Sequence, residues 1–296
     1  MKNHFFNLSP GYPVPLCPVF GTCGGCAYQD IPYEEELALK ERNLKSLFTQ
    51  KLGLSEDIFE PIAASPAPYH YRHRLDLSLK RVRGEYEMGF QLPGSSQLVP
   101  VDSCAIARRE ITAFLPELKK QAVAMIPEKY RTANLVVRTG DDGRVLWGGI
   151  GRRSLEMLPK DYFWTEVRGR RIFYSLDTFF QANLSILPAL MDKIESLCAF
   201  DRETVFLDLY SGVGLFGLCF APSVAKVIMM EDSSSSVSLA RYNAAWHGFK
   251  NVKVYQERVE TGLPAVLREN GEGRRIALVD PPRKGLAPAA LETLEL

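Results

Sequence analysis

The stretch Thr204–Gly217, TVFLDLYSGVGLFG, decides the fold of the C-terminal half of the chain. It opens with an apolar run that is typical of a strand buried on both faces of a parallel sheet. Glycines follow at the spacing G-x-G-x-x-G, as Gly212, Gly214 and Gly217, and apolar residues then begin a helix. A strand, a glycine loop and a helix in this order predict the nucleotide-binding turn of an α/β fold.

Strand and helix patterns alternate around this turn after residue 183. Strand patterns occupy 204–212, 225–232, 251–257 and 274–282, and helical patterns occupy 186–200, 213–221 and 235–248. The alternation predicts a parallel, doubly wound sheet. The fold class is therefore α/β, with a Rossmann-like domain over 176–296.

The first 175 residues show a different pattern. Residues 33–54 form a predicted helix with Gly53 as its stop signal. Period-two alternation makes 69–151 β-rich, interrupted by a helix near 108–125, and strands are expected to continue over 163–183. We therefore expect four parts: a cysteine loop at 1–30, a helix and linker at 31–68, a β-rich central domain at 69–175 and the Rossmann-like domain at 176–296.

Composition places the chain among globular proteins of about two domains, with 296 residues, 46% hydrophobic and 24% charged. The net charge of +1 does not identify a partner, since an average conceals local patches. No window is apolar over the ~18 residues that a membrane helix needs. The start, MKNHFFNLSPGYPVP, lacks the basic and apolar regions of a signal peptide. We therefore expect a cytoplasmic monomer that does not contact a membrane.

Three of the six cysteines crowd into one loop, CPVFGTCGGC, as Cys17, Cys23 and Cys26. Disulfides are rare in the cytoplasm, so six cysteines there indicate metal binding or chemistry for some of them. Cys104 follows a predicted strand and turn in LVPVDSC and completes a four-thiolate set. Structural zinc usually takes paired C-x2-C knuckles, and the second pair is absent here. The three-plus-one pattern beside a Gly-rich loop favours an iron–sulfur cluster, with zinc or no metal as the alternatives.

The glycine loop alone leaves two cofactor classes open. Glu231 closes the next strand at about the 20-residue distance where dinucleotide sites place a ribose-binding acid, so NAD is one candidate. Asp208 stands before the loop, where a carboxylate would repel a pyrophosphate. The last strand ends in DPPR at Asp280, on the sheet edge where ligands bind. S-adenosylmethionine has a ribose and a cationic sulfur but no phosphate, and it fits these acids better. Helix-capping or solvated carboxylates are the structural alternative for Asp208 and Glu231.

Four motifs occur in order along the chain: CPVFGTCGGC, DTFFQAN, DLYSGVGLFG and DPPRKGL. With them the chain resembles the RNA 5-methyluridine methyltransferases, and it looks like the iron–sulfur branch that modifies 23S ribosomal RNA. The tRNA branch lacks the cysteine cluster. The resemblance runs from about Cys17 to the last residue. It implies a β-rich domain with a 4Fe–4S cluster, packed on a Rossmann-like S-adenosylmethionine-dependent methyltransferase domain.

The resemblance also implies roles for individual residues. The 4Fe–4S cubane would be ligated by Cys17, Cys23, Cys26 and Cys104. S-adenosylmethionine would contact Gln181, Tyr210, Glu231 and Asp280, and Gln181 and Asp280 would lie near the target uracil. Asp208 and Gly212 join this cofactor-binding set from the argument on the glycine loop.

Two features depart from the family pattern. Members often have Asn or Thr in the part of the glycine region where this chain has Val213 and Leu215. The family's nucleophile is a cysteine in a Ser-Cys-Asn-Pro-like segment after DPPR, and its base is a later glutamate; neither occurs before Leu296. Cys198 and Cys219 cannot replace the nucleophile, because both lie in apolar, helix-like stretches where we expect buried side chains. We therefore expect a C-terminally incomplete methyltransferase domain that transfers no methyl group alone.

A basic stretch with interleaved rings provides the candidate RNA surface. Arg and Lys hold phosphates, and aromatic rings stack on exposed bases. The basic residues are Arg72, Arg74, Lys80, Arg81, Arg83, Arg168, Arg170 and Arg171, and the rings are Tyr69, His70, Tyr71 and His73. A solvated strand face is the alternative for these residues.

The expected function is therefore S-adenosylmethionine-dependent methylation of a uridine C5 in 23S ribosomal RNA. Two other classes stay open. One is a non-catalytic, RNA-binding remnant of such an enzyme, and the less favoured one is an NAD-dependent oxidoreductase.

Overall fold

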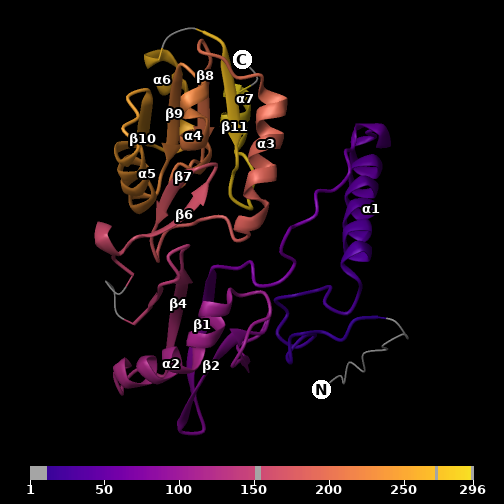
Figure 1. The fold of residues 1–296 in the computed structure, drawn as a ribbon, viewed down its shortest axis with the longest axis vertical. Coiled ribbons are helices and arrows are strands. Elements are labelled where there is room, and N and C mark those ends of the chain that lie inside the picture. Colours follow the sequence, from indigo (N-terminus) through magenta and orange to yellow (C-terminus); the bar gives the residue numbers. More distant parts are fainter. Residues whose placement is uncertain (1–11, 151–154, 271–272, 295–296) are drawn as a thin grey trace. The chain divides into compact units, whose positions relative to one another are not determined.

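The structure is a computed structural model that describes residues 12–150, 155–270 and 273–294 (Figure 1). The chain divides into two compact units. The N-terminal unit comprises Met1–Thr139 and Val145–Ser154, and the C-terminal unit comprises Gly140–Arg144 and Leu155–Leu296. The stretch in which no signal peptide is expected falls mostly in residues 1–11, which lie outside the described residues. Gly151 and Leu296 lie outside the described residues too.

A five-stranded antiparallel sheet with the order β3-β2-β1-β4-β5 forms the centre of the N-terminal unit. Its strands are β1 Arg74–Val82, β2 Glu85–Gln91, β3 Leu98–Pro100, β4 Thr132–Thr139 and β5 Val145–Gly148. Alternation along β1 puts Leu75, Leu77 and Leu79 on the buried face. Helix α2, Arg109–Met125, adds its buried apolar residues to the same core. The expected β-rich stretch with one helix is confirmed.

Helix α1, Tyr33–Leu52, confirms the helix expected at 33–54. Gly53 ends it in the left-handed conformation (φ 66°), where its N–H donates to the Thr49 carbonyl at 3.0 Å. No residue of α1 is buried, and a short 3-10 turn, η1 Glu56–Ile58, follows it. Among the described residues, no helix combines the length and the apolar character needed to cross a membrane.

A four-stranded parallel sheet with the order β10-β9-β8-β11 forms the centre of the C-terminal unit. Its strands are β8 Val205–Leu209, β9 Lys226–Glu231, β10 Val252–Gln256 and β11 Arg275–Val279. The helices are α3 Leu187–Cys198, α4 Leu215–Phe220, α5 Ser234–Trp246, α6 Val259–Glu269 and α7 Pro288–Leu294, with short 3-10 turns η2 Pro159–Asp161, η3 Leu184–Ile186 and η4 Ala221–Ser223. Figure 1 shows these helices beside the sheet. The predicted alternation of parallel strands and helices is confirmed.

The direction of chain progress reverses beside β8. From β8 the chain moves to β9 and then β10 on one side, and β11 pairs with β8 on the other. Open α/β sheets bind ligands at such a reversal, outside the carboxyl ends of the strands. The loops after β8 and β11 meet there, since the backbone N–H of Asp280 approaches the Leu209 carbonyl at 3.5 Å.

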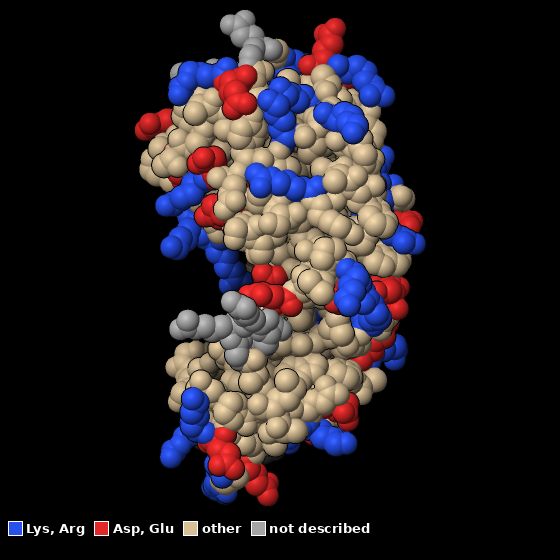
Figure 2. Space-filling view, turned by 90° about the vertical axis from the view of Figure 1, so that its left-hand side faces the viewer, with Lys and Arg blue, Asp and Glu red and all other residues tan. Residues whose placement is uncertain are grey.

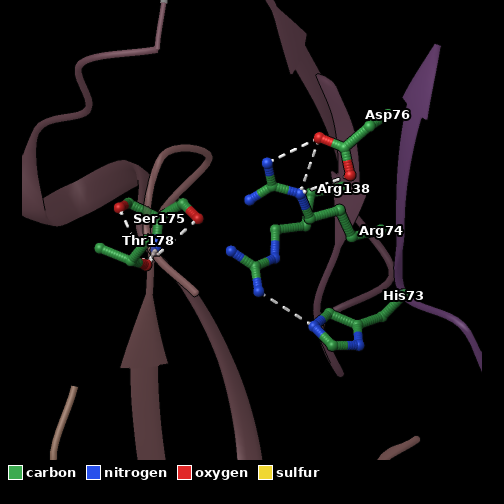
Figure 3. Close-up of polar contacts among 6 residues, drawn as sticks. All are labelled: His73, Arg74, Asp76, Arg138, Ser175 and Thr178. Carbon is green, nitrogen blue, oxygen red and sulfur yellow. Dashed lines mark hydrogen bonds and ion pairs between the residues drawn. The ribbon is translucent and has the colours of Figure 1, made fainter. Parts of the chain in front are cut away.

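An antiparallel hairpin, β6 Phe163–Val167 and β7 Arg170–Tyr174, also belongs to the C-terminal unit. This differs from the expected boundary after residue 175, because β7 packs on α5, where the Phe173 ring meets the rings of Tyr242 and Trp246 edge-on. The expectation that strands continue over 163–183 is wrong beyond β7. The chain turns at Ser175, whose N–H donates to Thr178 Oγ1 at 3.0 Å (Figure 3).

The turn Gly140–Arg144 belongs to the C-terminal unit, although strands β4 and β5 on either side of it belong to the N-terminal unit. The Asp141 carboxylate accepts hydrogen bonds from Thr165 Oγ1 at 2.7 Å and from the Glu166 N–H at 2.9 Å. The Arg144 guanidinium also donates to the Tyr162 carbonyl at 3.0 Å. Polar contacts therefore attach this turn to the β6–β7 hairpin.

Gly89 is a position in β2 where a side chain has no room. A Cβ there would lie 1.9 Å from the Val99 backbone oxygen, within the β2–β3 pairing. We predict that Gly89→Ala displaces β3 and lowers the free energy of unfolding by more than the ~1 kcal/mol of a typical substitution, as measured by urea denaturation.

Gly94→Ala is the matched control in the turn between the same strands. Its Cβ would meet nothing within 4 Å, and only the left-handed backbone (φ 69°) opposes it. That strain costs about 1–2 kcal/mol. A loss for Gly89→Ala no larger than that of the control would contradict the steric argument.

Candidate functional site

The glycine loop after β8 has a backbone that only some residues adopt easily. Gly212 (φ 55°) and Gly214 (φ 90°) are left-handed, and so is Tyr210 (φ 62°), which has a Cβ. Left-handed non-glycine residues concentrate at functional sites, where the surroundings hold the strain. The Ser211 N–H donates to the Met230 carbonyl at 3.0 Å, which attaches the loop to the end of β9.

Glu231 ends β9 and binds the glycine loop directly. Its Oε2 accepts the Gly212 N–H at 2.9 Å. Its Oε1 accepts the N–H groups of Asp232 at 3.1 Å and Ser233 at 2.9 Å. A carboxylate has about four acceptor positions, so this one keeps capacity for a ligand hydroxyl while the backbone fixes its orientation. The predicted proximity of Glu231 and the loop is present in the structure.

Asp208 lies beneath the loop, which differs from the expectation that it faces a ligand. Its side chain is 1% exposed, and its Oδ2 accepts the Gly217 N–H at 2.7 Å. Its Oδ1 is buried with no hydrogen-bond partner among the described residues. Burial, with smaller contributions from the Asp280 and Glu231 charges, raises the pKa of Asp208 from 3.8 to about 7.

A pocket opens beside the loop, and we call it the glycine-loop pocket. Residues of 179–181 form one wall, residues of 210–216 form the other, and Asp280 lies with them. Gln181 Nε2 donates to Asp280 Oδ2 at 3.2 Å. The cavity is about 30 Å³, so a nucleoside would lie across its mouth. The structure therefore brings together Gln181, Tyr210, Gly212 and Asp280, while Asp208 and Glu231 do not line the pocket.

Two further residues at this site were not predicted from the sequence. Phe179 lines the pocket with 68% of its surface exposed, and the FF pair of DTFFQAN was its only signal. The Tyr210 hydroxyl donates a hydrogen bond to Glu260 Oε1 on α6 at 3.0 Å. Burial, and then this hydrogen bond, raise the pKa of Tyr210 to about 12, so the phenol stays a donor.

The four predicted cysteine ligands line one cavity in the N-terminal unit, the cysteine pocket. Its volume is about 190 Å³, and its walls contain Cys17, Cys23, Cys26 and Cys104 with Gly21, Gly24 and Gly25. Burial raises the pKa of Cys23, Cys26 and Cys104. The Cys17 N–H donates to Gln29 Oε1 at 3.1 Å, which fixes the start of the loop. In the part of the chain that the structure describes, no His, Cys, Asp or Glu group of three or more is arranged to hold one metal ion.

The remaining cysteines differ from each other. Cys219 in α4 is 4% exposed, as expected, and burial raises its pKa to about 12. Cys198 is the last residue of α3 and is only partly buried, so the expectation of a buried side chain is wrong there. The end of a helix projects past the core that its apolar residues contact. Because a helix C-terminus also disfavours a thiolate, neither residue is an activated nucleophile.

The expected RNA surface is only partly available. His73 is fully buried and lies 3.1 Å from the Arg138 guanidinium, while Arg74 pairs with Asp76 at 2.7 Å (Figure 3). An arginine can only donate, so His73 Nε2 accepts this hydrogen bond. Figure 2 shows basic and acidic side chains interspersed on the visible face. The exposed arginines Arg81 and Arg83 retain the predicted character, and RNA binding stays a prediction.

The buried carboxyl of Asp208 gives the C-terminal unit a pH dependence. The folded state keeps the proton up to about pH 7, whereas the unfolded chain loses it near 3.8. This contribution to stability is therefore complete below about pH 4 and is lost as the pH rises through about 7. We predict that the free energy of unfolding of the wild type falls by a few kcal/mol between pH 5 and pH 8, and that Asp208→Asn lacks this fall, as measured by urea denaturation.

Asn keeps an oxygen that can accept the Gly217 N–H, so the variant changes the charge and little else. Glu203→Gln, at an exposed carboxylate just before β8, is the control and should retain the wild-type pH profile. If Asp208→Asn follows the wild-type profile as well, burial does not hold the proton on this group.

The chain is similar to known RNA methyltransferases over most of its length. Residues 150–295 match the sequence model of the family described as tRNA (Uracil-5-)-methyltransferase. An uncharacterized RNA methyltransferase of Clostridium tetani is 27% identical over 93% of this chain and 71% of its own length. One from Thermosynechococcus vestitus is 28% identical over 95% of this chain and 72% of its own.

A solved structure shows the shared fold. The tRNA (uracil-54, C5)-methyltransferase of Pyrococcus abyssi, in complex with S-adenosyl-L-homocysteine, superposes with a TM-score of 0.67 at 20% identity. The match covers 92% of this chain and 73% of that one. The C-terminal half of this chain thus carries the sequence pattern of the RNA uracil-5-methyltransferase family, and the chain as a whole is similar to proteins named RNA methyltransferases.

Proposed function

We propose that the chain takes part in S-adenosylmethionine-dependent methylation of a uridine C5 in RNA. The observation that carries the proposal is the hydrogen bond from Gln181 to Asp280, 3.2 Å long, beside the glycine loop. It joins the segment before α3 to the loop after β11 at the ligand-binding edge of the sheet. An amide and a carboxylate at one point offer donors and acceptors to the polar edge of a uracil.

The charges at the glycine-loop pocket support S-adenosylmethionine over NAD. Glu231 binds the loop, and the exposed Asp280 lines the pocket. Two carboxylates close to one ligand disfavour a pyrophosphate and favour a cationic sulfonium. The S-adenosylhomocysteine in the Pyrococcus abyssi structure supports the same assignment. In the proposal Glu231 accepts the ribose hydroxyls, Tyr210 contacts the nucleoside, and Asp208 supports the loop from below.

The chemistry requires activation of uracil, because C5 is a poor nucleophile. In this chemistry a thiolate adds at C6 of the uracil, and C5 then takes the methyl group from the sulfonium of S-adenosylmethionine. A general base removes the C5 proton, and the thiolate leaves C6. Before this reaction, the uracil must leave its stack in the folded RNA, which costs a few kcal/mol. The residues of this chain would bind the cofactor and hold the uracil. Cys198 and Cys219 are not suited to be the thiolate, so we propose that residues 1–296 position the reactants without completing the transfer.

We further propose that Cys17, Cys23, Cys26 and Cys104 hold a 4Fe–4S cluster. In a cubane each thiolate binds a different iron, so four sulfurs surround a cavity and do not converge on one ion. The lining of the cysteine pocket by all four residues supports this arrangement, and the glycines leave room for backbone N–H groups near the sulfurs. The cluster would supply structural support and RNA positioning.

The RNA class is the finer part of the proposal. The cysteine cluster supports 23S ribosomal RNA, because the chain resembles the iron–sulfur branch of the family and the tRNA branch lacks such a cluster. The Pyrococcus abyssi protein, which is named for a tRNA uridine, supports tRNA as the second candidate. We expect the protein to act as a cytoplasmic monomer.

Cofactor binding separates the methyltransferase from an oxidoreductase. We predict that calorimetry detects S-adenosylhomocysteine binding and no NADH binding. Glu231→Gln should weaken S-adenosylhomocysteine binding about tenfold or more, because it removes a charged acceptor from the ribose. Glu203→Gln, at the opposite edge of the sheet, should bind as the wild type does. NADH binding as tight as that of S-adenosylhomocysteine would reject the proposed cofactor.

Metal content tests the cysteine site. Protein purified without oxygen should be brown and contain about four irons per chain, and Cys104→Ser should lose most of this iron. Cys198→Ser is the matched control, since Cys198 lies outside the cysteine pocket, and it should keep the iron. Colourless protein with stoichiometric zinc would be incompatible with the cluster.

A further inference from the structure

One buried side chain, Asn243 of α5, binds Val213 in one wall of the glycine-loop pocket and Phe173, which precedes the other wall in the chain. Asn243 is fully buried. Its Oδ1 accepts the Phe173 N–H at 2.8 Å, and its Nδ2 donates to the Phe173 carbonyl at 3.0 Å. The same Nδ2 donates to the Val213 carbonyl at 3.0 Å. One amide therefore connects β7 to the glycine loop.

The orientation of this amide is set by its partners. The two Nδ2 protons go to two carbonyl oxygens, and the oxygen faces an N–H. A flipped amide would put its NH2 against the Phe173 N–H and its oxygen against carbonyls. Both donor positions are used, so no other neutral side chain of the same shape satisfies all three backbone groups.

The connection from Phe173 to the first wall is short and stiff. β7 ends at Tyr174, whose ring stacks on Phe180 with centroids 4.6 Å apart. Between them, Ser175 and Thr178 close a buried turn, and their side chains face each other in Figure 3. Gln181 follows at once and binds Asp280. A shift of Phe173 would therefore be passed to the wall residues.

The connection to the second wall acts on a part of the loop that glycines flank on both sides. Val213 lies between Gly212 and Gly214, both left-handed. Glycines restrict the backbone less than any other residue, so the loop depends on hydrogen bonds for its position. The bond to Asn243 holds it from the side of α5, and the bond from Gly212 to Glu231 holds it from β9.

We propose that Asn243 is a positioning residue that sets the spacing between the two walls of the glycine-loop pocket. The identity of the ligand rests on the proposed function, whereas the spacing itself does not. Because the pocket is narrow, about 30 Å³, a small shift of either wall changes how a nucleoside fits. Other contacts keep β7 on α5, including His247 Nε2 with the Arg171 carbonyl at 2.8 Å, so loss of the amide changes the spacing locally.

The test uses Asn243→Asp, which keeps the shape and the acceptor for Phe173 but removes both donors. Asn251→Asp is the matched control. Asn251 Nδ2 also donates to two carbonyls, those of Ala221 at 2.8 Å and Val224 at 3.2 Å, in the turn before β9 and away from the pocket. We expect Asn243→Asp to weaken S-adenosylhomocysteine binding about tenfold or more. Asn251→Asp should lower the melting temperature about as much as Asn243→Asp does, and yet keep the wild-type affinity.

Hydrogen–deuterium exchange tests the spacing without any ligand. Asn243→Asp should speed exchange in both 210–216 and 175–181, with β9 and β10 unchanged. Asn243→Ser, which brings no charge, should do the same and serves if the aspartate variant does not fold. Unchanged exchange in either wall, or an equal rise throughout the C-terminal unit, would overturn the inference. If the wild type binds no S-adenosylhomocysteine, the proposed function fails while the exchange result still decides on Asn243.

Discussion

The pairing of β8 with β9 on one side and β11 on the other is the constraint on which the C-terminal unit depends. Every residue of β8 is buried, and the strand has a hydrogen-bonded neighbour on each side, which fixes its position in the sheet. The glycine loop, Glu231 and Asp280 then follow three adjacent strands at one edge. Chemistry at this edge comes from the order of the strands, since it brings together groups that are distant in the sequence.

Burial determines which acids at this edge can act on a ligand. Asp208 lies one strand residue away from the loop, yet it is enclosed and binds a helix N–H, so it supports the backbone. Glu231 and Asp280 keep contact with the pocket or its loop and retain acceptor capacity. Three carboxylates with similar positions in the sequence pattern thus differ in place: Asp208 lies beneath the loop, Glu231 binds the loop backbone, and Asp280 lines the pocket.

The sequence predicted the elements of the fold better than their partners. The strand, loop and helix at 204–217 and the helix α1 were predicted correctly, because glycine spacing and apolar periodicity are local signals. The burial of Asp208 was not, since a strand covered on both faces has no alternation that marks one face as exposed. The contacts of Glu260 with Tyr210 and of Asn243 with Val213 depend on packing between distant segments, which no local pattern encodes. The sequence did not predict that the β6–β7 hairpin belongs to the C-terminal unit, for the same reason.

The turn Gly140–Arg144 has a consequence for how the protein can be divided. The chain passes between the units three times, at 139/140, 144/145 and 154/155, and β5 lies between two of these crossings. Cutting after Thr139 would remove β5, which pairs with Val136 through Thr139 of β4. No single cleavage or gene fusion point therefore yields both units whole: a cut at 154/155 keeps the N-terminal unit intact but separates the turn Gly140–Arg144 from the rest of the C-terminal unit.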